Sequence, residues 1–232
     1  MSSKLFSIEV LSNLHVGSGE INYGLVDNLI QRDPVTELPN INSSSLKGAL
    51  REYFKHIEKK EKKEKIWTVN EIFGSDPKAK DNRKQGSVRF FEAELLAIPV
   101  RCENRLYKMV TSKNIIDSFV EKMKMFEISL PAHVLYQTIG INEQDTITHE
   151  DFKNYCSDAE LPVISRNNLE NGQSANLWYE QVLPKYSILA FVVMGEGDAF
   201  DDFCKELDNS YLQIGANATI GYGYCRLKEV KS

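Results

Sequence analysis

Residues 186–207 read YSILAFVVMGEGDAFDDFCKEL and predict a strand that is followed directly by a helix. The apolar run from Ile188 to Met194 is typical of a buried strand. After it, apolar side chains recur at helical spacing, at Phe200, Phe203, Cys204 and Leu207. We therefore expect a strand over 186–194 and a helix over 199–208.

Similar patterns lie on both sides of this unit. Before it in the sequence come a stretch of alternating apolar and polar residues, a helical pattern and a second extended stretch. After it comes one further extended stretch. The predicted elements are strands at 5–11, 88–98 and 222–230 and a helix at 45–60. The complete order is β-α-β-β-α-β, the order of a ferredoxin-like or RNA-recognition-motif palm. The sequence thus predicts one α+β domain over 1–232, with the palm at about 1–98 and 186–232 and a long insertion at about 99–185.

The insertion carries the signals of two helices and a hairpin. Ser112 opens one amphipathic pattern, and Thr148 with Asp151 forms the cap of a shorter helix. Asn171-Gly172 is a preferred hairpin turn, and extended, partly apolar stretches flank it. We expect the segment at about 160–185 to form a thumb hairpin that projects from the palm.

Composition excludes several classes of protein. The 232 residues are 42% hydrophobic and 10% aromatic, which supports one large domain with a core and excludes global disorder. There is no run of 18 apolar residues and no signal-peptide pattern, so we expect a cytoplasmic protein without a membrane partner. The four cysteines lie far apart, without a C-x-x-C pair, which favours buried free thiols over a zinc finger or a disulfide scaffold.

The charge is unevenly distributed along the chain. The net charge is −5, but 55–89 holds eleven Lys and Arg against six Asp and Glu. In contrast, 143–208 holds four basic and fourteen acidic residues. This asymmetry suggests a basic face beside an acidic one, although a solvated, charged helix explains 55–65 equally well. The net negative charge therefore does not exclude an RNA-binding protein.

Two motifs are suited to binding phosphate. In Ser44-Ser45-Leu46-Lys47-Gly48, the free N–H groups of a helix start lie beside a lysine and can bind an anion. An ordinary helix, capped by its serines and carrying an exposed lysine, is the alternative. The glycine-rich segment 215–223 could form an anion-binding nest of backbone N–H groups, or simply a tight turn.

Candidate catalytic side chains lie in the loop after the first predicted strand. His15 and Asp27 could supply a base, an acid or a metal-bound carboxylate. A structural histidine and a turn carboxylate are the alternatives. Tyr179 and Glu180 could also serve a site, although packing of the aromatic residues with a solvent-facing Glu180 is the simpler interpretation.

These segments are parts of a longer ordered pattern. In the first half of the chain it comprises HVGSG at 15–19, GLVD at 24–27, IQRD at 30–33, Leu38-Pro39, SSLKG at 44–48 with Leu50-Arg51, FGS at 73–75 and AELLAIPV at 93–100. In the second half it comprises LWYE at 177–180, LQIG at 212–215 and NAT at 217–219. The pattern resembles the RAMP superfamily of CRISPR effector proteins. Within it, the chain is most similar to the repeated backbone subunit of the type III-B (Cmr) complex, and next to the type III-A (Csm) backbone.

The resemblance implies a function. Copies of such a subunit stack as a filament along the crRNA, together with other type III effector subunits. The filament acts as an endoribonuclease, which cuts target RNA at regular intervals by 2′-OH attack. Asp27 matches the aspartate used for cleavage, as base, metal ligand or positioner of the phosphate. His15, the other catalytic candidate, and Lys47 match positions near the RNA backbone. The implied cofactor is a divalent cation, expected to be Mg²⁺, with Asp27 as its ligand. The expected RNA-binding residues are Lys47, Ser44, Ser45, Gly48, Arg51, Gly215, Asn217, Thr219 and Gly221.

The chain departs from the family pattern at three points. Asn42-Ser43 stands where the family has Pro-Gly, and Ala216 replaces the second glycine of Gly-Gly-Asn. The chain is also short for the type III-B family. Two alternative functions also stay open: a filament subunit that binds RNA without cutting it, and a ferredoxin-like domain that binds a small ligand and has no RNA role.

Overall fold

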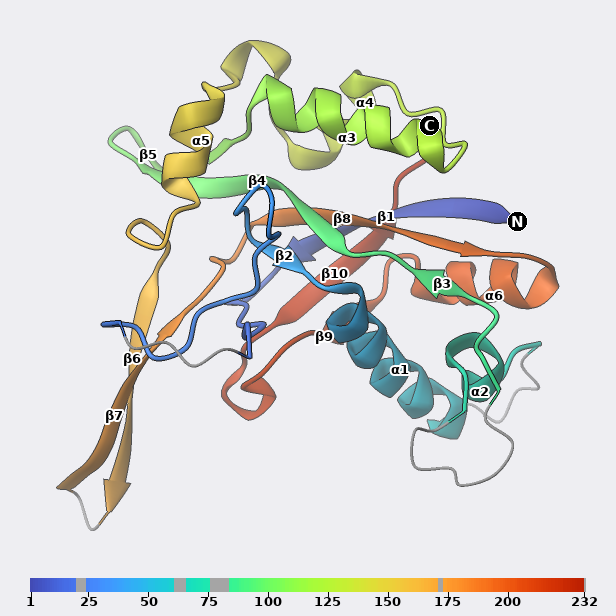
Figure 1. Cartoon of the computed structure of the whole chain (residues 1–232), viewed down its shortest axis with the longest axis horizontal. Helices are drawn as coiled ribbons and strands as arrows, with labels where there is room; N and C mark the ends of the chain where they lie inside the picture. The colour runs from blue at the N-terminus through green and yellow to red at the C-terminus, as the bar shows by residue number, and fades with distance from the viewer. Residues whose placement is uncertain (20–23, 61–65, 76–83, 171–172, 232) are drawn as a thin grey trace.

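A single curled antiparallel sheet organises the molecule. The computed structural model describes residues 1–19, 24–60, 66–75, 84–170 and 173–231. Four strands form the centre of the sheet in the order β4-β8-β1-β10, and each adjacent pair is antiparallel. These strands are β1 (Ser2–Val10), β4 (Ala93–Cys102), β8 (Ile188–Gly195) and β10 (Tyr224–Glu229). This is the order of a ferredoxin-like palm, so the predicted α+β fold is confirmed (Figure 1).

Shorter strands extend the sheet. They are β2 (Asn40–Ile41), β3 (Arg89–Phe90), β5 (Arg105–Val110) and β9 (Tyr211–Gln213). The strand predicted over 88–98 is divided into β3 and β4. Phe90 pairs with Val193 and Glu94 pairs with Ala190. From Phe90 to Glu94 the chain advances by four residues, while β8 advances by only three between the two partners. One extra residue at this point produces a bulge that interrupts the predicted strand.

Helices cover both faces of the sheet (Figure 1). One face packs against α1 (Ser43–Lys60) and α6 (Asp198–Leu207), and the other against α3 (Lys113–Met125) and α4 (Ala132–Ile139). In β8, Leu189, Phe191 and Val193 face the first pair of helices. Ile188, Ala190 and Val192 face the second pair. Burial on both faces explains why β8 is a continuous apolar run rather than an alternating one.

The helix α1 begins earlier than its sequence pattern suggests. Leu46, Leu50 and Phe54 are fully buried at intervals of four residues, as the helical spacing predicted. The serines were expected to cap the helix. Instead the helix starts at Ser43, and the N–H of Leu46 donates to the carbonyl of Asn42. The serines therefore occupy the first turn, and the position before the helix is Asn42.

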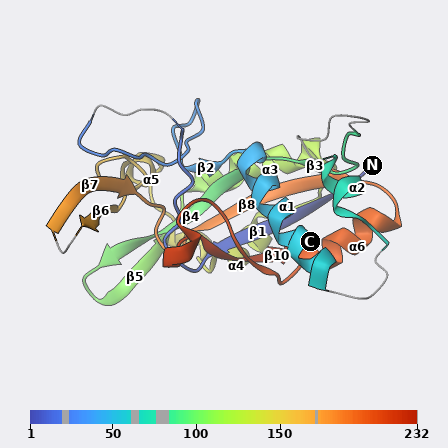
Figure 2. The same cartoon turned by 90° about the horizontal axis from the view of Figure 1, so that it is seen from below.

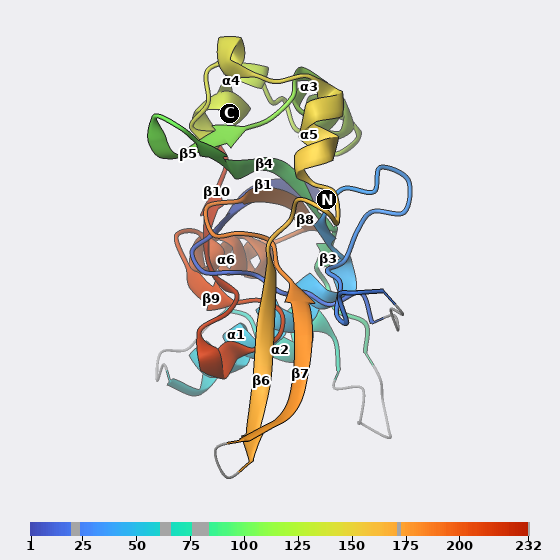
Figure 3. The same ribbon diagram turned by 90° about the vertical axis from the view of Figure 1, so that its left-hand side faces the viewer.

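The insertion forms a helical layer and a hairpin. Ser112 and Thr148 cap α3 and α5 (His149–Tyr155), as predicted. The helix α4, the short η1 (Glu143–Asp145) and α2 (Val69–Phe73) were not predicted. The hairpin consists of β6 (Val163–Glu170) and β7 (Gln173–Gln181), and it extends away from the sheet (Figure 3). The predicted turn at 171–172 and the end of the charged tract at 61–65 lie outside the described residues.

Two further expectations concern thiols and membranes. All four cysteines are free; Cys156, Cys204 and Cys225 are buried and Cys102 is half-buried. Burial raises the pKa of each of the three buried thiols to about 12. Among the described residues, no helix is long and apolar enough to cross a bilayer.

Candidate active site and nucleic-acid interface

The loop that carries Asp27 lies along the edge of β7. The backbone N–H groups of Asp27 and Asn28 both donate to the carbonyl of Tyr179, at 3.1 Å each. In return, the N–H of Tyr179 donates to Asp27 Oδ2 at 2.8 Å. The N–H of Gln181 then donates to the carbonyl of Asn28 at 2.9 Å. The Asp27 side chain is exposed, so the hairpin holds a solvent-accessible carboxylate at a defined position.

His15 is attached to the same strand but faces inward. Its side chain is 5% exposed, and Nδ1 lies 2.7 Å from the carbonyl oxygen of Gln181. A carbonyl only accepts hydrogen bonds, so Nδ1 carries the hydrogen and donates it. In the neutral ring Nε2 is then an acceptor, and it lies on the side of Gly17. The structure thus brings His15 and Asp27 to neighbouring residues of β7, one buried and one exposed.

A buried carboxylate joins the hairpin to the glycine-rich loop. Glu180 is 5% exposed, although the sequence predicted that it faces solvent, and that prediction is wrong. Its oxygens accept from Trp178 Nε1 at 2.9 Å, from Asn217 Nδ2 at 2.8 Å and from Arg166 Nη1 at 3.2 Å. Arg166 also donates to Asn217 Oδ1 at 2.7 Å and lies over the Trp178 ring. These four residues are called the Glu180 clamp below.

The glycine-rich loop packs against the backbone at His15. Gly215 has φ +83°, and a Cβ at this position would overlap with the His15 carbonyl oxygen. The N–H of Ala216 donates to the same oxygen at 2.9 Å. Asn217 is left-handed, with φ 66°. Thr219 and Gly221 are exposed, in and just after the single turn η2 (Ala218–Ile220). Gly215 therefore serves a close backbone approach, and the outer part of the loop is open to solvent.

A groove brings the two predicted phosphate motifs together. It has a volume of about 790 Å³ and lies between α1 and the segment that follows β9. Among its lining residues are Ser44, Ser45, Gly48, Gly215 and Ala216. Buried Gln31 supports this arrangement, because its Nε2 donates to Ser45 Oγ at 2.9 Å and to the carbonyl of Gly17 at 3.2 Å. The first turn of α1 is thereby attached to the loop that begins at His15.

The two cations near the start of α1, Lys47 and Arg51, do not line this groove. Lys47 Nζ lies 5.8 Å from the centre of the Phe90 ring. Burial, and secondarily the nearby Arg51, lower the pKa of the Lys47 ammonium. The Arg51 guanidinium holds the end of α2, with hydrogen bonds to the Gly74 carbonyl at 3.0 Å and to Asn70 Oδ1 at 3.3 Å. The sequence suggested that Arg51 contacts RNA. In the structure its guanidinium is already hydrogen-bonded within the protein, to Gly74 and Asn70.

The Glu180 clamp had one signal in the sequence. Side chains of a strand alternate between its faces, so Trp178 and Glu180 share one face of β7. Leu177 and Tyr179, on the opposite face, are 51% and 40% exposed. Alternation alone therefore places Glu180 beside a tryptophan. The partners Arg166 and Asn217 could not be found in this way, because they come from another strand and a distant loop.

Comparison with known proteins assigns this architecture to a family. The profile of the RAMP superfamily matches residues 7–226. The chain belongs to the RAMP superfamily. It is 26% identical, over 99% of its length, to a protein of Pyrococcus furiosus named CRISPR system Cmr endoribonuclease Cmr4, and the match covers 97% of that protein. The alignment runs over 294 positions, which is more than the 232 residues of this RAMP chain, so the relative has segments that this chain lacks.

A second relative matches less of the RAMP chain. The CRISPR system Cms endoribonuclease Csm3 of Enterococcus italicus is 29% identical over 59% of this chain and 71% of its own. The Cmr4 relative is thus matched over nearly the whole chain and the Csm3 relative over part of it. This agrees with the order of the two resemblances in the sequence pattern.

Solved structures share the fold of this RAMP chain. A cryo-EM structure of the type III-B Cmr-beta complex bound to cognate target RNA contains a chain with a TM-score of 0.77 and 19% identity; the match covers 99% of this chain and 98% of that one. The crystal structure of oligomeric Cmr4 from Pyrococcus furiosus gives a TM-score of 0.70 at 21% identity, with full coverage of both chains. The palm with its insertion and hairpin is therefore the fold of these backbone subunits.

Proposed function

We propose that this RAMP protein is a backbone subunit of a cytoplasmic type III-B CRISPR effector complex, which binds crRNA and cuts target RNA. The observation that carries the proposal is the exposed Asp27 carboxylate, held by the Tyr179 N–H where the loop meets the hairpin. The similarity to a protein named Cmr endoribonuclease, over nearly the whole length of both chains, supports the same activity. Copies of the chain and other type III subunits are the proposed protein partners.

The chemistry we propose is transesterification within the RNA. The 2′-oxygen attacks the adjacent phosphorus, the bond from phosphorus to the 5′-oxygen breaks, and the products end in a 2′,3′-cyclic phosphate and a 5′-hydroxyl. Attack in line requires a nucleotide that is splayed out of helical geometry. The β6–β7 hairpin, which extends away from the sheet, is the proposed wedge that displaces it (Figure 3). Asp27 would take the 2′-OH proton, hold a metal ion or position the phosphate.

A divalent cation is part of the proposal. Among the described residues, no group of three or more His, Cys, Asp or Glu side chains could hold a metal ion. Magnesium is commonly held by one or two carboxylates together with substrate phosphates, so a single exposed Asp27 fits such a site. A Mg²⁺ ion bound there supplies positive charge that stabilises the developing charge on the phosphate.

His15 has a different part in this proposal. Its burial and its contact with Gln181 favour a positioning role over direct proton transfer. It fastens the loop to β7 two residues beyond Tyr179, which is the residue that orients Asp27. The groove beside Ser44, Ser45 and Gly48 is the proposed binding site of the guide backbone.

Two alternatives are separated by one experiment. The protein is purified from its host, and short RNAs that copurify with it are sequenced and tested as guides against a labelled complementary RNA with magnesium. Copurified RNAs of uniform 5′ sequence together with regularly spaced cuts support the proposal. Copurified RNA without cleavage would indicate a binding-only filament subunit. Absence of RNA would favour a ferredoxin-like domain that binds a small ligand.

A further inference from the structure

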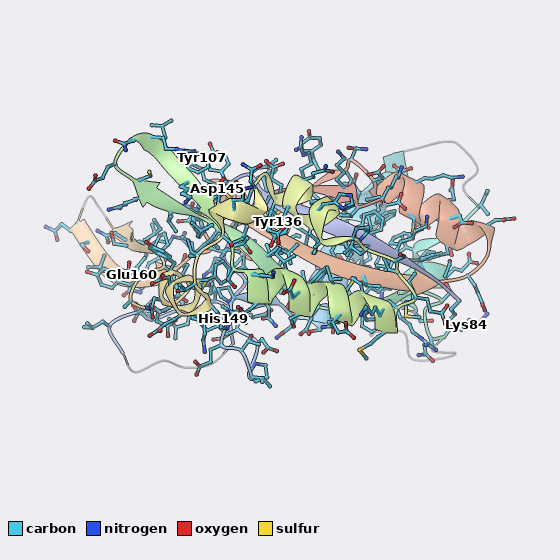
Figure 4. The ribbon with its side chains drawn as sticks, turned by 90° about the horizontal axis from the view of Figure 1, so that it is seen from above. Lys84, Tyr107, Tyr136, Asp145, His149 and Glu160 are labelled. Carbon is cyan, nitrogen blue, oxygen red and sulfur yellow. The ribbon has the colours of Figure 1, made fainter. Side chains whose placement is uncertain are left out.

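A second groove lies where the β4–β5 hairpin meets the base of the β6–β7 hairpin. Its volume is about 530 Å³. Apolar, charged and aromatic side chains line it. The charged and aromatic ones are Arg101, Tyr107, Tyr155, Glu160, Lys185 and Tyr186. Both hairpins extend from the same end of the molecule (Figure 2), and Tyr107 and Glu160 lie towards that end (Figure 4). The site described above uses none of these residues.

Aromatic rings are stacked at this groove. The rings of Tyr107 and Tyr186 are 4.7 Å apart between centres and inclined by only 11°. Lys185 Nζ lies 5.3 Å from the centre of the Tyr186 ring. Tyr107 is 37% exposed and Tyr155 is 41% exposed. Partly exposed aromatic rings of this kind are groups on which unpaired bases stack.

The backbone holds Tyr186 in an unfavourable conformation. Its φ is 76°, in the left-handed region that a bulky side chain rarely adopts. The Tyr186 N–H donates to the carbonyl of Val10 at 2.6 Å, which fixes this conformation at the end of β1. Strain of this kind persists where the surrounding structure over-determines it, and it is concentrated at functional sites. Here it accompanies the stack of Tyr186 on Tyr107.

The charges around the groove are suited to phosphate. Arg101, Arg105 and Lys185 are exposed and Lys108 is half-buried. Within the described part of the chain, these four cations have no ion pair with a carboxylate. Glu103 and Glu160 are the exposed carboxylates of the β4–β5 hairpin and the groove, so the four cations leave a local positive charge in a chain whose net charge is −5. Unpaired cations beside stacked aromatic rings match the two requirements of single-stranded RNA, which are backbone charge and base stacking.

We propose that this second groove binds unpaired bases of RNA. Tyr107 stacks on a base, Arg101 and Lys185 contact the flanking phosphates, and the Glu160 carboxylate accepts a hydrogen bond from an exocyclic amine of a base. The inference rests on the proposed function in one respect, namely that the chain binds RNA. It adds a contact surface that is separate from the groove beside α1.

The test measures binding of the full-length protein, freed of RNA, to a short unstructured single-stranded RNA by fluorescence anisotropy. Tyr107→Ala should weaken binding by about 5- to 150-fold, which is the range expected for loss of one base–aromatic stack. Tyr107→Phe keeps the ring and should bind like the wild type. Lys185→Ala should reduce the salt dependence of binding by about one phosphate contact. Lys124→Ala, an exposed lysine on α3, is the matched control and should have no effect.

The outcomes are distinguishable. If the wild type binds no RNA, the proposed function itself fails. If the wild type binds RNA and both Tyr107→Ala and Lys185→Ala bind equally well, the second groove is not an RNA site. Normal RNA affinity combined with impaired self-association of these variants would also overturn the inference, since the groove would then be a protein-docking surface. Lys185 is exposed, so its variant keeps the test valid even if Tyr107→Ala folds poorly.

Discussion

The carboxylate of Asp27 accepts a hydrogen bond from the backbone N–H of Tyr179, 152 positions later in the chain, at 2.8 Å. The donor is a backbone group of β7, so the orientation of Asp27 depends on where the hairpin lies. The Glu180 clamp fixes β7 against the glycine-rich loop from the next position. The catalytic candidate, the hairpin and one side of the proposed guide groove are therefore mechanically linked.

Asp27→Asn should abolish target cleavage in assembled complexes while the affinity for guide and target stays nearly unchanged. Asparagine keeps the oxygen that accepts from Tyr179 but loses the charge needed for a base or a metal ligand. General acid–base catalysis typically contributes about 10²–10⁴-fold, so cleavage should fall by at least this range. The measurement is a gel of labelled target RNA with magnesium. Glu37→Gln, an exposed acid of the same region, is the control. Wild-type ladders from Asp27→Asn would remove this residue from catalysis.

Lys47→Ala should weaken guide binding and lower its salt dependence by about one phosphate contact. The reason is that Lys47 carries a positive charge close to the first turn of α1, where the free N–H groups and the helix dipole favour an anion. A filter-binding titration over a range of salt concentrations measures the slope. Lys55→Ala on the same helix serves as the control, because Lys55 is already paired with Glu52 at 2.7 Å. An unchanged slope for Lys47→Ala would argue against this contact.

Glu180→Gln should lower the free energy of unfolding by about 1–3 kcal/mol, the cost of leaving buried donors without their acceptor. The glutamine amide would point a donor towards Arg166 or Asn217, which are donors themselves. Urea unfolding gives the free energy, and amide exchange at Asp27 and Tyr179 should become faster. Glu121→Gln removes an exposed ion pair and should change stability by less than about 1 kcal/mol. Equal free energies of unfolding for the two variants would mean that the Glu180 clamp does not stabilise the fold.

Two glycine substitutions should have opposite effects on stability. Gly215→Ala forces a side chain to φ +83° and against the His15 carbonyl, so it should destabilise the protein by more than about 1 kcal/mol. Gly48 lies within α1, and no atom beyond the adjacent residues and backbone of its own helix comes within 4 Å of the new Cβ, so Gly48→Ala should stabilise the helix by about 0.5–1 kcal/mol. Thermal unfolding measures both. A more stable Gly48→Ala that binds guide RNA less tightly would place the guide backbone against this turn.

The buried thiols should make stability depend on pH in the alkaline range. The pKa values of Cys156, Cys204 and Cys225 rise from 9.0 to about 12 on folding. Between these values the unfolded chain loses thiol protons that the folded chain retains, so stability is complete below pH 9 and falls as the pH rises towards 12. Iodoacetamide at pH 8 should modify half-buried Cys102 first. Rapid modification of Cys156, Cys204 and Cys225 in the native protein would contradict their burial.

Local sequence patterns determined the β-α-β-β-α-β order of the palm, the starts of α3 and α5, and the position of Asp27 in a loop after the first strand. These features depend on periodicity and capping, which neighbouring residues set between themselves. The tertiary structure decided what periodicity cannot encode. Glu180 meets Asn217 37 positions later, Tyr107 stacks on Tyr186, and Arg51 binds α2 instead of remaining free. Each of these contacts depends on the register of strands and the path of loops that are distant in sequence. A predicted site residue is therefore assigned to the surface or to the interior only when the chain is folded.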